Sequence, residues 1–346
     1  MDLRSLLNLD DYERLEVIHD ARSGLTAVIA IHSTKLGPGL GGCRMWNYPS
    51  VEDAIIDAVR LARGMTYKSA MAELPFGGGK AVIIGDPGKD KNERLFRAFG
   101  RFINRLQGEY ITGMDVGTTS ADMDWVFQET RYVTDISGSL GAAGTFTADM
   151  TAYGVFLAMK ASLKKLDGSE SLSGKVVAVQ GLGKVGMFLC RYLALAGAKL
   201  VVSDLNDELV RKAVQDYGAQ ASGVDQIARE LCDIFSPCAL GGIINDASIP
   251  QLQCRIVAGA ANNQLAEERH GDVLHRRGIL YAPDYVINAG GIIVTAAELN
   301  ANSPSYARSR VEQIYRTLTN VFDWSDKHGV STAKAANQLT EQLLGE

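Results

Sequence analysis

Three consecutive glycines, Gly77–Gly79, lead directly into Lys80, and both Lys68 and Asp115 lie within 40 residues of this run. Glycines leave the backbone without side chains, so that a ligand can approach it closely. A lysine acts as a base only when its amine is neutral, and burial or a neighbouring cation lowers the pKa of a lysine. The second lysine would supply that cation and could also bind a substrate carboxylate. The alternative interpretation is a glycine turn before the strand 81–84, with a solvated lysine at its start.

A second group of residues has the spacing of a dinucleotide-binding turn. Gly181, Gly183 and Gly186 form a G-x-G-x-x-G pattern between an apolar run and a helical pattern, and Asp204 ends the next apolar run. Such glycines let the backbone approach a pyrophosphate, and the N–H groups at the start of the helix bind it. The carboxylate would accept hydrogen bonds from a ribose diol and repel a 2′-phosphate, so the pattern predicts NAD rather than NADP. The alternative is a tight strand–helix turn with a solvated aspartate.

In an open parallel sheet, ligands bind beyond the carboxyl ends of the strands. The predicted cofactor site therefore extends to the turns that follow two later apolar runs, at 233–235 and 255–257. Lys184 could either contact a phosphate or point outward. The residues predicted to contact the cofactor from these turns are Gly181, Leu182, Gly183, Lys184, Val185, Gly186, Asp204, Cys238, Ala239, Leu240, Ala260 and Asn262.

These residues need elements to position them, and the chain alternates strand and helix patterns. The first third contains a β-branched run at 24–31, a helix that Ser50 would cap, and helical spacing of apolar residues over 95–106. Residues 132–149 are rich in Gly, Ser, Ala and Thr and predict a connector, with a helix beginning near Thr151. We expect a flexible connector there to let two domains hinge about a cleft.

From residue 175 onward, short apolar strands alternate with helices, which predicts a parallel, doubly wound sheet. The strands are expected at 176–179, 200–202, 233–235, 255–257 and 279–281, and helices at 306–322 and 331–344. The predicted fold class is therefore α/β with two domains and a cleft between them. Residues 1–135 would form an α/β substrate-binding and oligomerisation domain, and residues 136–330 a Rossmann-type NAD-binding domain. The C-terminal helix, at about 331–346, would pack back on the first domain.

Composition narrows the class of partner. The chain has 346 residues, of which 46% are apolar and 22% charged, and its formal net charge is −5. An acidic protein is a poor match for nucleic acid or an anionic membrane. No signal peptide or membrane-spanning run is apparent. The five cysteines form no C-x-x-C pair, which favours free thiols in the cytoplasm and disfavours a metal site. His270 and His275 are expected to be solvated.

Several motifs together resemble one enzyme family over nearly the whole chain. The sequence is similar to the Glu/Leu/Phe/Val amino acid dehydrogenases, and most of all to the leucine dehydrogenases among them. The motifs that carry this resemblance are GPGLGGCRMW (37–46), RGMTYK (63–68), GGGK (77–80), DVGT (115–118), GAANNQL (259–265) and YAPDYVINAGG (281–291).

The resemblance implies roles for individual residues. Lys80 would be the catalytic amine, Asp115 its acid/base partner and Lys68 the ligand of the substrate α-carboxylate. Asn262 would contact the substrate carboxylate or the nicotinamide ribose, and Thr151 the nicotinamide carboxamide. The remaining substrate-binding residues would be Leu40, Gly41, Gly42, Met65, Gly113 and Val294. The family also implies a homo-oligomer, either an octamer or another assembly built from dimers.

The implied reaction is NAD-dependent, reversible oxidative deamination of an L-amino acid to a 2-oxo acid and ammonia. Glutamate dehydrogenases have a lysine where this chain has Leu40, and an apolar residue there would leave a distal carboxylate unpaired. Leu40, Val294 and the small Gly113 indicate an apolar pocket for leucine or another branched-chain substrate. Because Gly113 lacks bulk, phenylalanine or another aromatic substrate is the alternative.

Two other classes of function fit the sequence less well. A non-catalytic NAD-sensing module would not need the two lysines and the aspartate that this chain retains. A hydroxy-acid dehydrogenase would need a histidine paired with a carboxylate as its base, and the five histidines have no evident acidic partner near a strand end.

Overall fold

The computed structural model describes residues 11–141 and 144–345, and its contacts divide the chain into two compact units. The first unit extends to Gly144 and includes Thr295–Ser303, and the second contains 145–294 and 304–346. We predicted a boundary at 135/136 and a C-terminal helix, at about 331–346, that returns to the first domain. The short segment 295–303 belongs to the first unit because Glu298 accepts hydrogen bonds there from Thr134 and from the backbone of Gly141.

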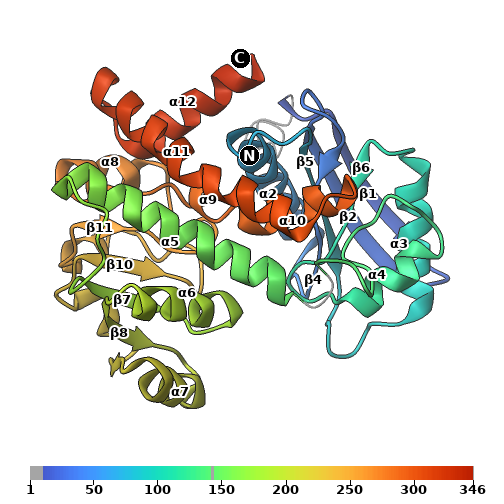
Figure 1. Ribbon diagram of the computed structural model, residues 1–346. Coiled ribbons are helices and arrows are strands. Elements are labelled where there is room, and N and C mark those ends of the chain that lie inside the picture. The colour runs from blue at the N-terminus through green and yellow to red at the C-terminus, as the bar shows by residue number, and fades with distance from the viewer. Residues whose placement is uncertain (1–10, 142–143, 346) are drawn as a thin grey trace. The chain divides into compact units, whose positions relative to one another are not determined.

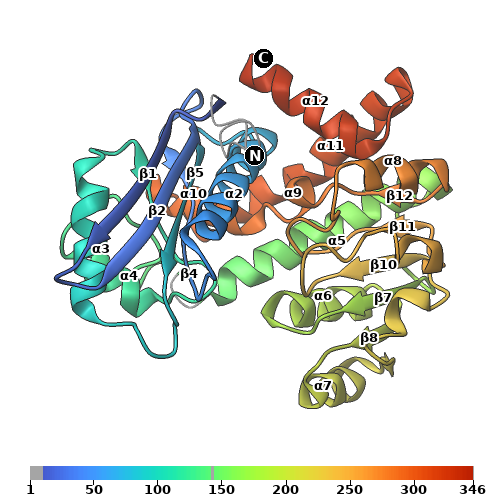
Figure 2. The ribbon, with the colours of Figure 1, turned by 180° about the vertical axis from the view of Figure 1, so that it is seen from behind.

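The first unit is built on a mixed sheet with strand order β1-β2-β5-β3-β6, and β4 pairs with the end of β5 (Figures 1 and 2). Its strands are β1 (Arg14–Asp20), β2 (Leu25–Ser33), β3 (Gly39–Leu40), β4 (Cys43–Trp46), β5 (Gly77–Ile84) and β6 (Tyr110–Ile111). Its helices are α2 (Val51–Met71), α3 (Glu93–Arg105) and α4 (Ser120–Phe127). The predicted strand at 24–31 and both predicted helices are confirmed, and the Ser50 side chain caps α2 by accepting from Asp53 N–H.

Side chains alternate along β2 and divide the core of this unit into two layers. Leu25, Ala27, Ile29 and Ile31 pack with α3 and α4, whereas Val28 and Ala30 pack with the alanine-rich face of α2. This alternation is what a strand buried on both faces requires, because successive side chains point to opposite sides of the sheet. The central strands therefore have little freedom to shift, and β5 carries Lys80.

The second unit is the predicted doubly wound parallel sheet, with strand order β12-β11-β10-β7-β8-β9. Its strands are β7 (Val176–Gln180), β8 (Lys199–Ser203), β9 (Gln220–Ala221), β10 (Ile234–Pro237), β11 (Ile256–Val257) and β12 (Leu280–Tyr281). Its helices are α5 (Thr145–Asp167), α6 (Lys184–Leu195), α7 (Asp207–Tyr217), α8 (Arg269–Arg276), α9 (Asp284–Ile287), α11 (Pro304–His328) and α12 (Thr332–Leu344). Helix α10 (Gly290–Leu299) includes the division at 294/295.

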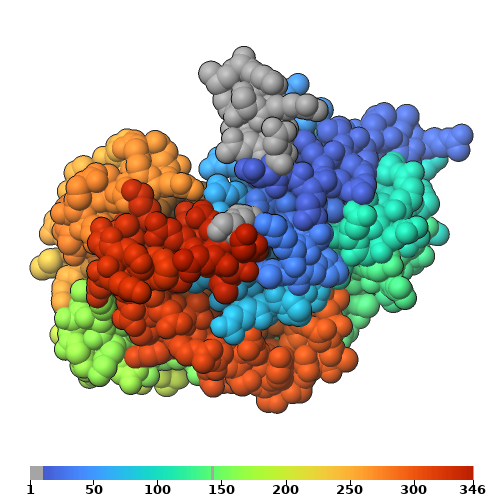
Figure 3. Space-filling view, turned by 90° about the horizontal axis from the view of Figure 1, so that it is seen from above, coloured from blue at the N-terminus to red at the C-terminus, as the bar shows by residue number. Residues whose placement is uncertain are grey.

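Three details differ from the prediction. Helix α5 begins at Thr145, six residues before the expected start near Thr151. The exposed two-residue strand β9 was not predicted. Helix α12 packs within the second unit rather than returning to the first: Ser331 Oγ donates to Asp272 and Thr332 Oγ1 donates to the Tyr281 carbonyl. Figure 3 shows the C-terminal residues, in red, against the orange surface of the second unit.

Two sequence-based expectations about the whole chain can be compared with these elements. All five cysteines are free thiols, as predicted. Among the described residues, we find no helix that combines the length and the apolar character needed to cross a membrane.

Candidate active site

Lys80 and Asp115, the predicted catalytic pair, lie in direct contact. Lys80 is on the central strand β5 with only 5% of its surface exposed, and its Nζ is 2.8 Å from Asp115 Oδ2. Asp115 follows β6 in a turn that Thr118 closes, because the Thr118 hydroxyl accepts from Asp115 N–H at 2.9 Å. The alternative of a solvated lysine at a glycine turn is therefore wrong, since Gly77–Gly79 are themselves part of β5.

The glycines before Lys80 serve packing rather than ligand access, contrary to our interpretation of the sequence. A Cβ on Gly79 would lie 2.6 Å from the Tyr110 ring, and one on Gly78 would overlap Thr66 of α2. The space that the missing side chains leave is therefore filled by the protein itself. The run of glycines lets α2 and Tyr110 approach the strand closely enough to bury Lys80.

The Asp115 carboxylate has two cationic partners. Arg44 Nε donates to Asp115 Oδ2 at 3.0 Å, the same oxygen that contacts Lys80. Burial opposes ionisation of this carboxyl, but Lys80 and Arg44 outweigh it and lower the pKa of Asp115 to about 2. Asp115 is thus a carboxylate at neutral pH and can accept a proton or a hydrogen bond from Lys80.

Several of the predicted substrate-binding residues gather near this pair within the first unit. Lys68 is in the last turn of α2, the helix that packs on β5, and Met65 is one turn earlier. A Cβ on Gly41 would lie 3.2 Å from Met65 Cγ, and one on Gly42 would lie 3.1 Å from Asp115 Cβ. Leu40 is buried in β3, where it pairs with Gly78 and Ile111.

Gly113 does not provide the extra room that we inferred from the sequence. A Cβ at this position would lie 2.5 Å from Asp135 Oδ2 and 2.8 Å from Thr134 Cγ2. Asp135 occupies this space because its carboxylate accepts a hydrogen bond from Met114 N–H. The absence of a side chain at Gly113 is therefore a packing requirement, and it gives no support to an aromatic substrate.

In the second unit, the turn between β7 and α6 has the features that a pyrophosphate needs. Gly181 has φ +99°, a conformation that L side chains rarely adopt. Gly186 packs against the Gly181 carbonyl so closely that a Cβ would overlap it. Gly183 caps α6 without a side-chain hydrogen bond and has open space where a Cβ would stand. The first N–H groups of α6 therefore face a surface that a phosphate can reach.

Asp204 stands where a ribose-binding acid is expected, directly after β8. Its carboxylate is fixed at this turn, accepting from Leu182 N–H at 2.6 Å and from Asn206 N–H at 2.8 Å. Leu182 therefore meets Asp204 through its backbone N–H, while its side chain is buried. Lys184 is exposed at the start of α6 and Val185 is half-buried. Ala239 lies against Gly181.

The turns after β10 and β11 add further groups. Asn288 Nδ2 donates to Asn262 Oδ1 and to the Ala260 carbonyl, and among the described residues Asn288 Oδ1 is buried without a hydrogen-bond partner. A buried acceptor of this kind fits an amide donor such as a carboxamide. Thr151 donates to the Thr147 carbonyl in α5, and its Oγ1 would be 3.4 Å from a Cβ on Gly291.

Two residues beside the predicted cofactor turns were given no role in the prediction. Asn288 was quoted as part of a motif only. Leu205, immediately after Asp204, is a large apolar side chain that is 86% exposed. Leu240 is similarly exposed, and Cys238 adjoins the glycine-rich turn near Gly186. Val294, which was predicted to bind the substrate, is fully buried in α10 and belongs to the second unit.

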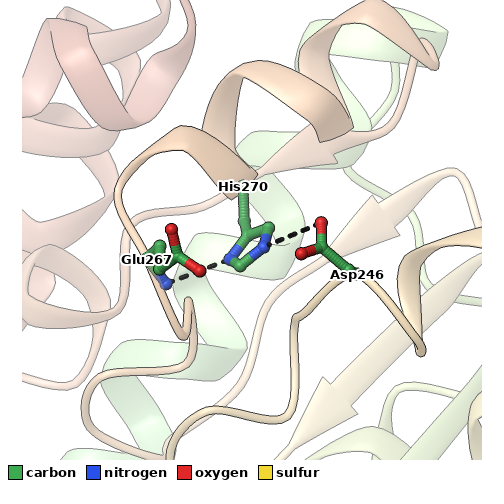
Figure 4. Close-up of side chains that lie close together, drawn as sticks. All are labelled: Asp246, Glu267 and His270. Atoms are coloured by element: carbon green, nitrogen blue, oxygen red, sulfur yellow. Dashed lines mark hydrogen bonds and ion pairs between the residues drawn. The ribbon is translucent and has the colours of Figure 1, made fainter.

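His270 is buried rather than solvated, whereas His275 is exposed as expected. Figure 4 shows the His270 ring between Glu267 and Asp246: its Nδ1 accepts from Glu267 N–H at 3.0 Å and its Nε2 is 3.3 Å from Asp246 Oδ1. These three residues could bring ligand atoms to one metal ion. However, Arg269 already pairs with both carboxylates, and both ring nitrogens of His270 have partners. The cluster therefore fastens the start of α8 and offers no free base to a substrate.

Comparison with known proteins finds relatives over nearly the whole chain. The sequence model of the Glu/Leu/Phe/Val dehydrogenase dimerisation domain matches residues 14–132, and that of the Glutamate/Leucine/Phenylalanine/Valine dehydrogenase domain matches 141–213 and 206–342. Leucine dehydrogenase from Geobacillus stearothermophilus is 55% identical over 344 residues, covering 99% of this chain and 94% of that protein. Phenylalanine dehydrogenase from Lysinibacillus sphaericus is 45% identical over 339 residues, covering 96% and 89%. The crystal structure of L-tryptophan dehydrogenase from Nostoc punctiforme matches with a TM-score of 0.85 and 43% identity, covering 99% of each chain.

Proposed function

Because the chain belongs to the Glu/Leu/Phe/Val dehydrogenase family, we propose that it catalyses NAD-dependent, reversible oxidative deamination of a branched-chain L-amino acid, with leucine preferred. The observation that carries this proposal is the buried ion pair between Lys80 and Asp115. An amine and a carboxylate in contact can exchange a proton, which is what formation and breakdown of a carbinolamine require.

In this mechanism the residues of the first unit handle the substrate and its protons. Lys68 binds the α-carboxylate. After the Cα–H bond breaks, Lys80 in its neutral form takes a proton from the water that attacks the iminium carbon. Asp115 then assists the collapse of the carbinolamine to the 2-oxo acid and ammonia. A positioned acid or base contributes about 10²–10⁴-fold to such a step.

The residues of the second unit fit NAD. Gly181, Gly183 and Gly186 with the start of α6 would hold the pyrophosphate, and Asp204 the adenosine ribose. Asn262, together with Thr151 and with Asn288 Oδ1, which has no partner in the part of the chain that the structure describes, would hold the nicotinamide half. When bound, NAD supplies the acceptor for the hydride that leaves the substrate Cα. An Asp204 carboxylate would repel the 2′-phosphate of NADP.

The substrate preference rests on the wall that Leu40 forms and on the relatives. Leu40 is buried and apolar, so a carboxylate beside it would be desolvated and unpaired, which costs several kcal/mol. The leucine dehydrogenase is 55% identical to this chain and the phenylalanine dehydrogenase 45%. Because Gly113 leaves no extra room, an aromatic substrate is supported only by the weaker similarity to the phenylalanine dehydrogenase and to the L-tryptophan dehydrogenase, at 45% and 43% identity. Apolar pockets discriminate by only ~1–3 kcal/mol per methylene, so we expect activity with valine and isoleucine as well.

A panel of L-amino acids, assayed for NADH formation at neutral and alkaline pH, tests the proposal. We expect leucine, isoleucine and valine to be oxidised fastest and glutamate not at all. Rates should rise toward alkaline pH because the reaction needs a neutral amine on both the substrate and Lys80. Faster oxidation of phenylalanine or tryptophan than of leucine would contradict the proposed preference, and no oxidation of any amino acid would contradict the proposed reaction.

The match to a dimerisation domain supports an assembly of several copies, and we propose a homo-oligomer built from dimers, such as an octamer. Five free thiols are consistent with the reducing cytoplasm, where we propose that the protein acts. The proposed partners are the amino acid, its 2-oxo acid and ammonia, with no role for nucleic acid or a membrane.

A further inference from the structure

Arg44 is the second cation on the carboxylate that contacts the catalytic amine, and nothing in the sequence analysis gave it a role. We infer that Arg44, held in place by Asp57 and Tyr48, positions the Asp115 carboxylate and divides its negative charge, so that Lys80 can release its proton. This inference rests on the proposed function, since it assigns Arg44 as a positioning residue for the base of that reaction.

The contacts of Arg44 form a continuous chain within the first unit. Its Nε donates to Asp115 Oδ2 at 3.0 Å and its Nη1 donates to Asp57 Oδ2 at 2.9 Å. Tyr48 donates its hydroxyl to the same Asp57 oxygen at 2.5 Å. The guanidinium is therefore fixed at two of its nitrogens by carboxylates from separate elements, and its planar fork holds the Asp115 side chain at a defined angle.

Charge is balanced across this chain. Lys80 and Arg44 are two cations, and Asp115 and Asp57 are two anions, all of them buried or half-buried. The nitrogens of Lys80 and Arg44 contact one and the same oxygen, so they lie within about 6 Å of each other, a range in which like charges disfavour one another. Without Arg44, the full charge of Asp115 would act on the Lys80 ammonium and hold its proton more tightly.

Among the other titratable groups, Lys68 in the last turn of α2 is the cation that the sequence predicts near Lys80, and every variant in the test below keeps it. Cys43 and Tyr110 are fully buried, and burial raises the pKa of both well above its usual range, so both stay neutral. Lys91 and Asp122 pair with each other at 2.5 Å. Arg44 and Asp57 are therefore the charges that a substitution can change without removing Lys80, Asp115 or Lys68, the proposed ligand of the substrate carboxylate.

The test is the pH at which Lys80 becomes reactive toward acetic anhydride, measured by peptide mass spectrometry, with the pH profile of kcat/KM for leucine measured in parallel. Arg44→Met removes a cation. We therefore expect the midpoint of the Lys80 acetylation curve to move up by about half to one pH unit, and kcat to fall at least about tenfold. Asp57→Asn removes an anion but leaves Arg44, so the midpoint should move down. Opposite shifts cannot result from a loss of stability alone.

Two further variants serve as controls. Arg44→Lys keeps the charge and loses the fork, so we expect the midpoint to return toward that of the native protein while kcat stays reduced. Arg60→Met removes an exposed arginine of α2 and should change neither quantity. Should Arg44→Met fail to fold, Asp57→Asn alone decides through the sign of its shift.

An unshifted midpoint in Arg44→Met, or shifts of the same sign in Arg44→Met and Asp57→Asn, would overturn the inference. Acetylation of Lys80 can be measured without any turnover. The proposed role of Arg44 and the proposed dehydrogenase function can therefore be contradicted independently of each other. A native protein that oxidises no amino acid, but shows the expected opposite shifts, would contradict the proposed function and leave the role of Arg44 supported.

Discussion

At the scale of single residues, Asp204 carries the proposed choice of cofactor. Its carboxylate is fixed by Leu182 and Asn206 at the end of β8, where a ribose would present its two hydroxyls. We predict that Asp204→Ser lowers kcat/KM for NAD by about 10- to 100-fold, because a hydrogen bond to a charged group is lost, and lowers it less for NADP. Asp207→Ser, an exposed position at the start of α7, is the matched control. An unchanged ratio of NAD to NADP activity would contradict the assignment.

The motifs indicated the proposed reacting groups but not what surrounds them. The family resemblance implied that Asp115 is the partner of Lys80, and the two side chains are in contact. By contrast, Gly79 and Gly113 were interpreted as open space, and the structure fills them with Tyr110 and with Asp135. What occupies the space beside a glycine depends on tertiary contacts that local sequence spacing does not report.

At the scale of elements, continuous apolar runs made the buried parallel strands predictable, because both faces of such strands are covered. Strand β9 has two exposed residues and therefore no apolar pattern to detect. The first turns of α5 are rich in Thr and lack apolar periodicity, so the start at Thr145 was placed too late. An amphipathic pattern predicted that α12 packs somewhere, but it did not specify against which unit.

Helix α10 contributes an electrostatic feature that no sequence pattern indicated. Asp135 adopts a left-handed backbone conformation (φ +60°) and is 8% exposed, beside Gly113 and Gly141. Burial, and then the nearby Glu298 of α10, raise the pKa of Asp135 to about 6, against the hydrogen bond from Met114 N–H. The folded protein therefore keeps this carboxyl protonated at pH values where the unfolded chain has already lost the proton.

A raised carboxyl pKa makes the folded state less stable as pH rises from about 4 to 6, and the loss is complete above that interval. This loss in the free energy of unfolding is at most about 3 kcal/mol, and a variant without the Asp135 carboxylate should not show it. We predict that Asp135→Asn raises Tm relative to the native protein by about 5 °C at pH 7.5, and by much less at pH 4.5. Glu52→Gln, an exposed position in the first turn of α2, is the control. A difference in Tm that does not change between the two pH values would contradict the burial of a charged Asp135.

At the scale of the whole molecule, the chain divides the work between two units. The proposed proton-transfer groups are in the first unit, and the turns that fit NAD are in the second. The chain crosses between the units at 144/145, 294/295 and 303/304. The doubly wound fold of the second unit was predictable from its sequence, but these crossings were not. Residues 295–303 are the end of a helix and a loop, and no pattern in their sequence indicates that they pack in the first unit.

This division makes cofactor binding and chemistry separable by experiment, and the central claim is that Lys80 is the base. The most direct measurement is leucine turnover by Lys80→Ala, together with a fluorescence titration of NADH. We predict that turnover falls by about 10²–10⁴-fold or more while NADH binds with native affinity. Lys89→Ala, which removes an exposed lysine from the same unit, should leave both quantities unchanged. Turnover by Lys80→Ala within a few-fold of the native rate would contradict the account.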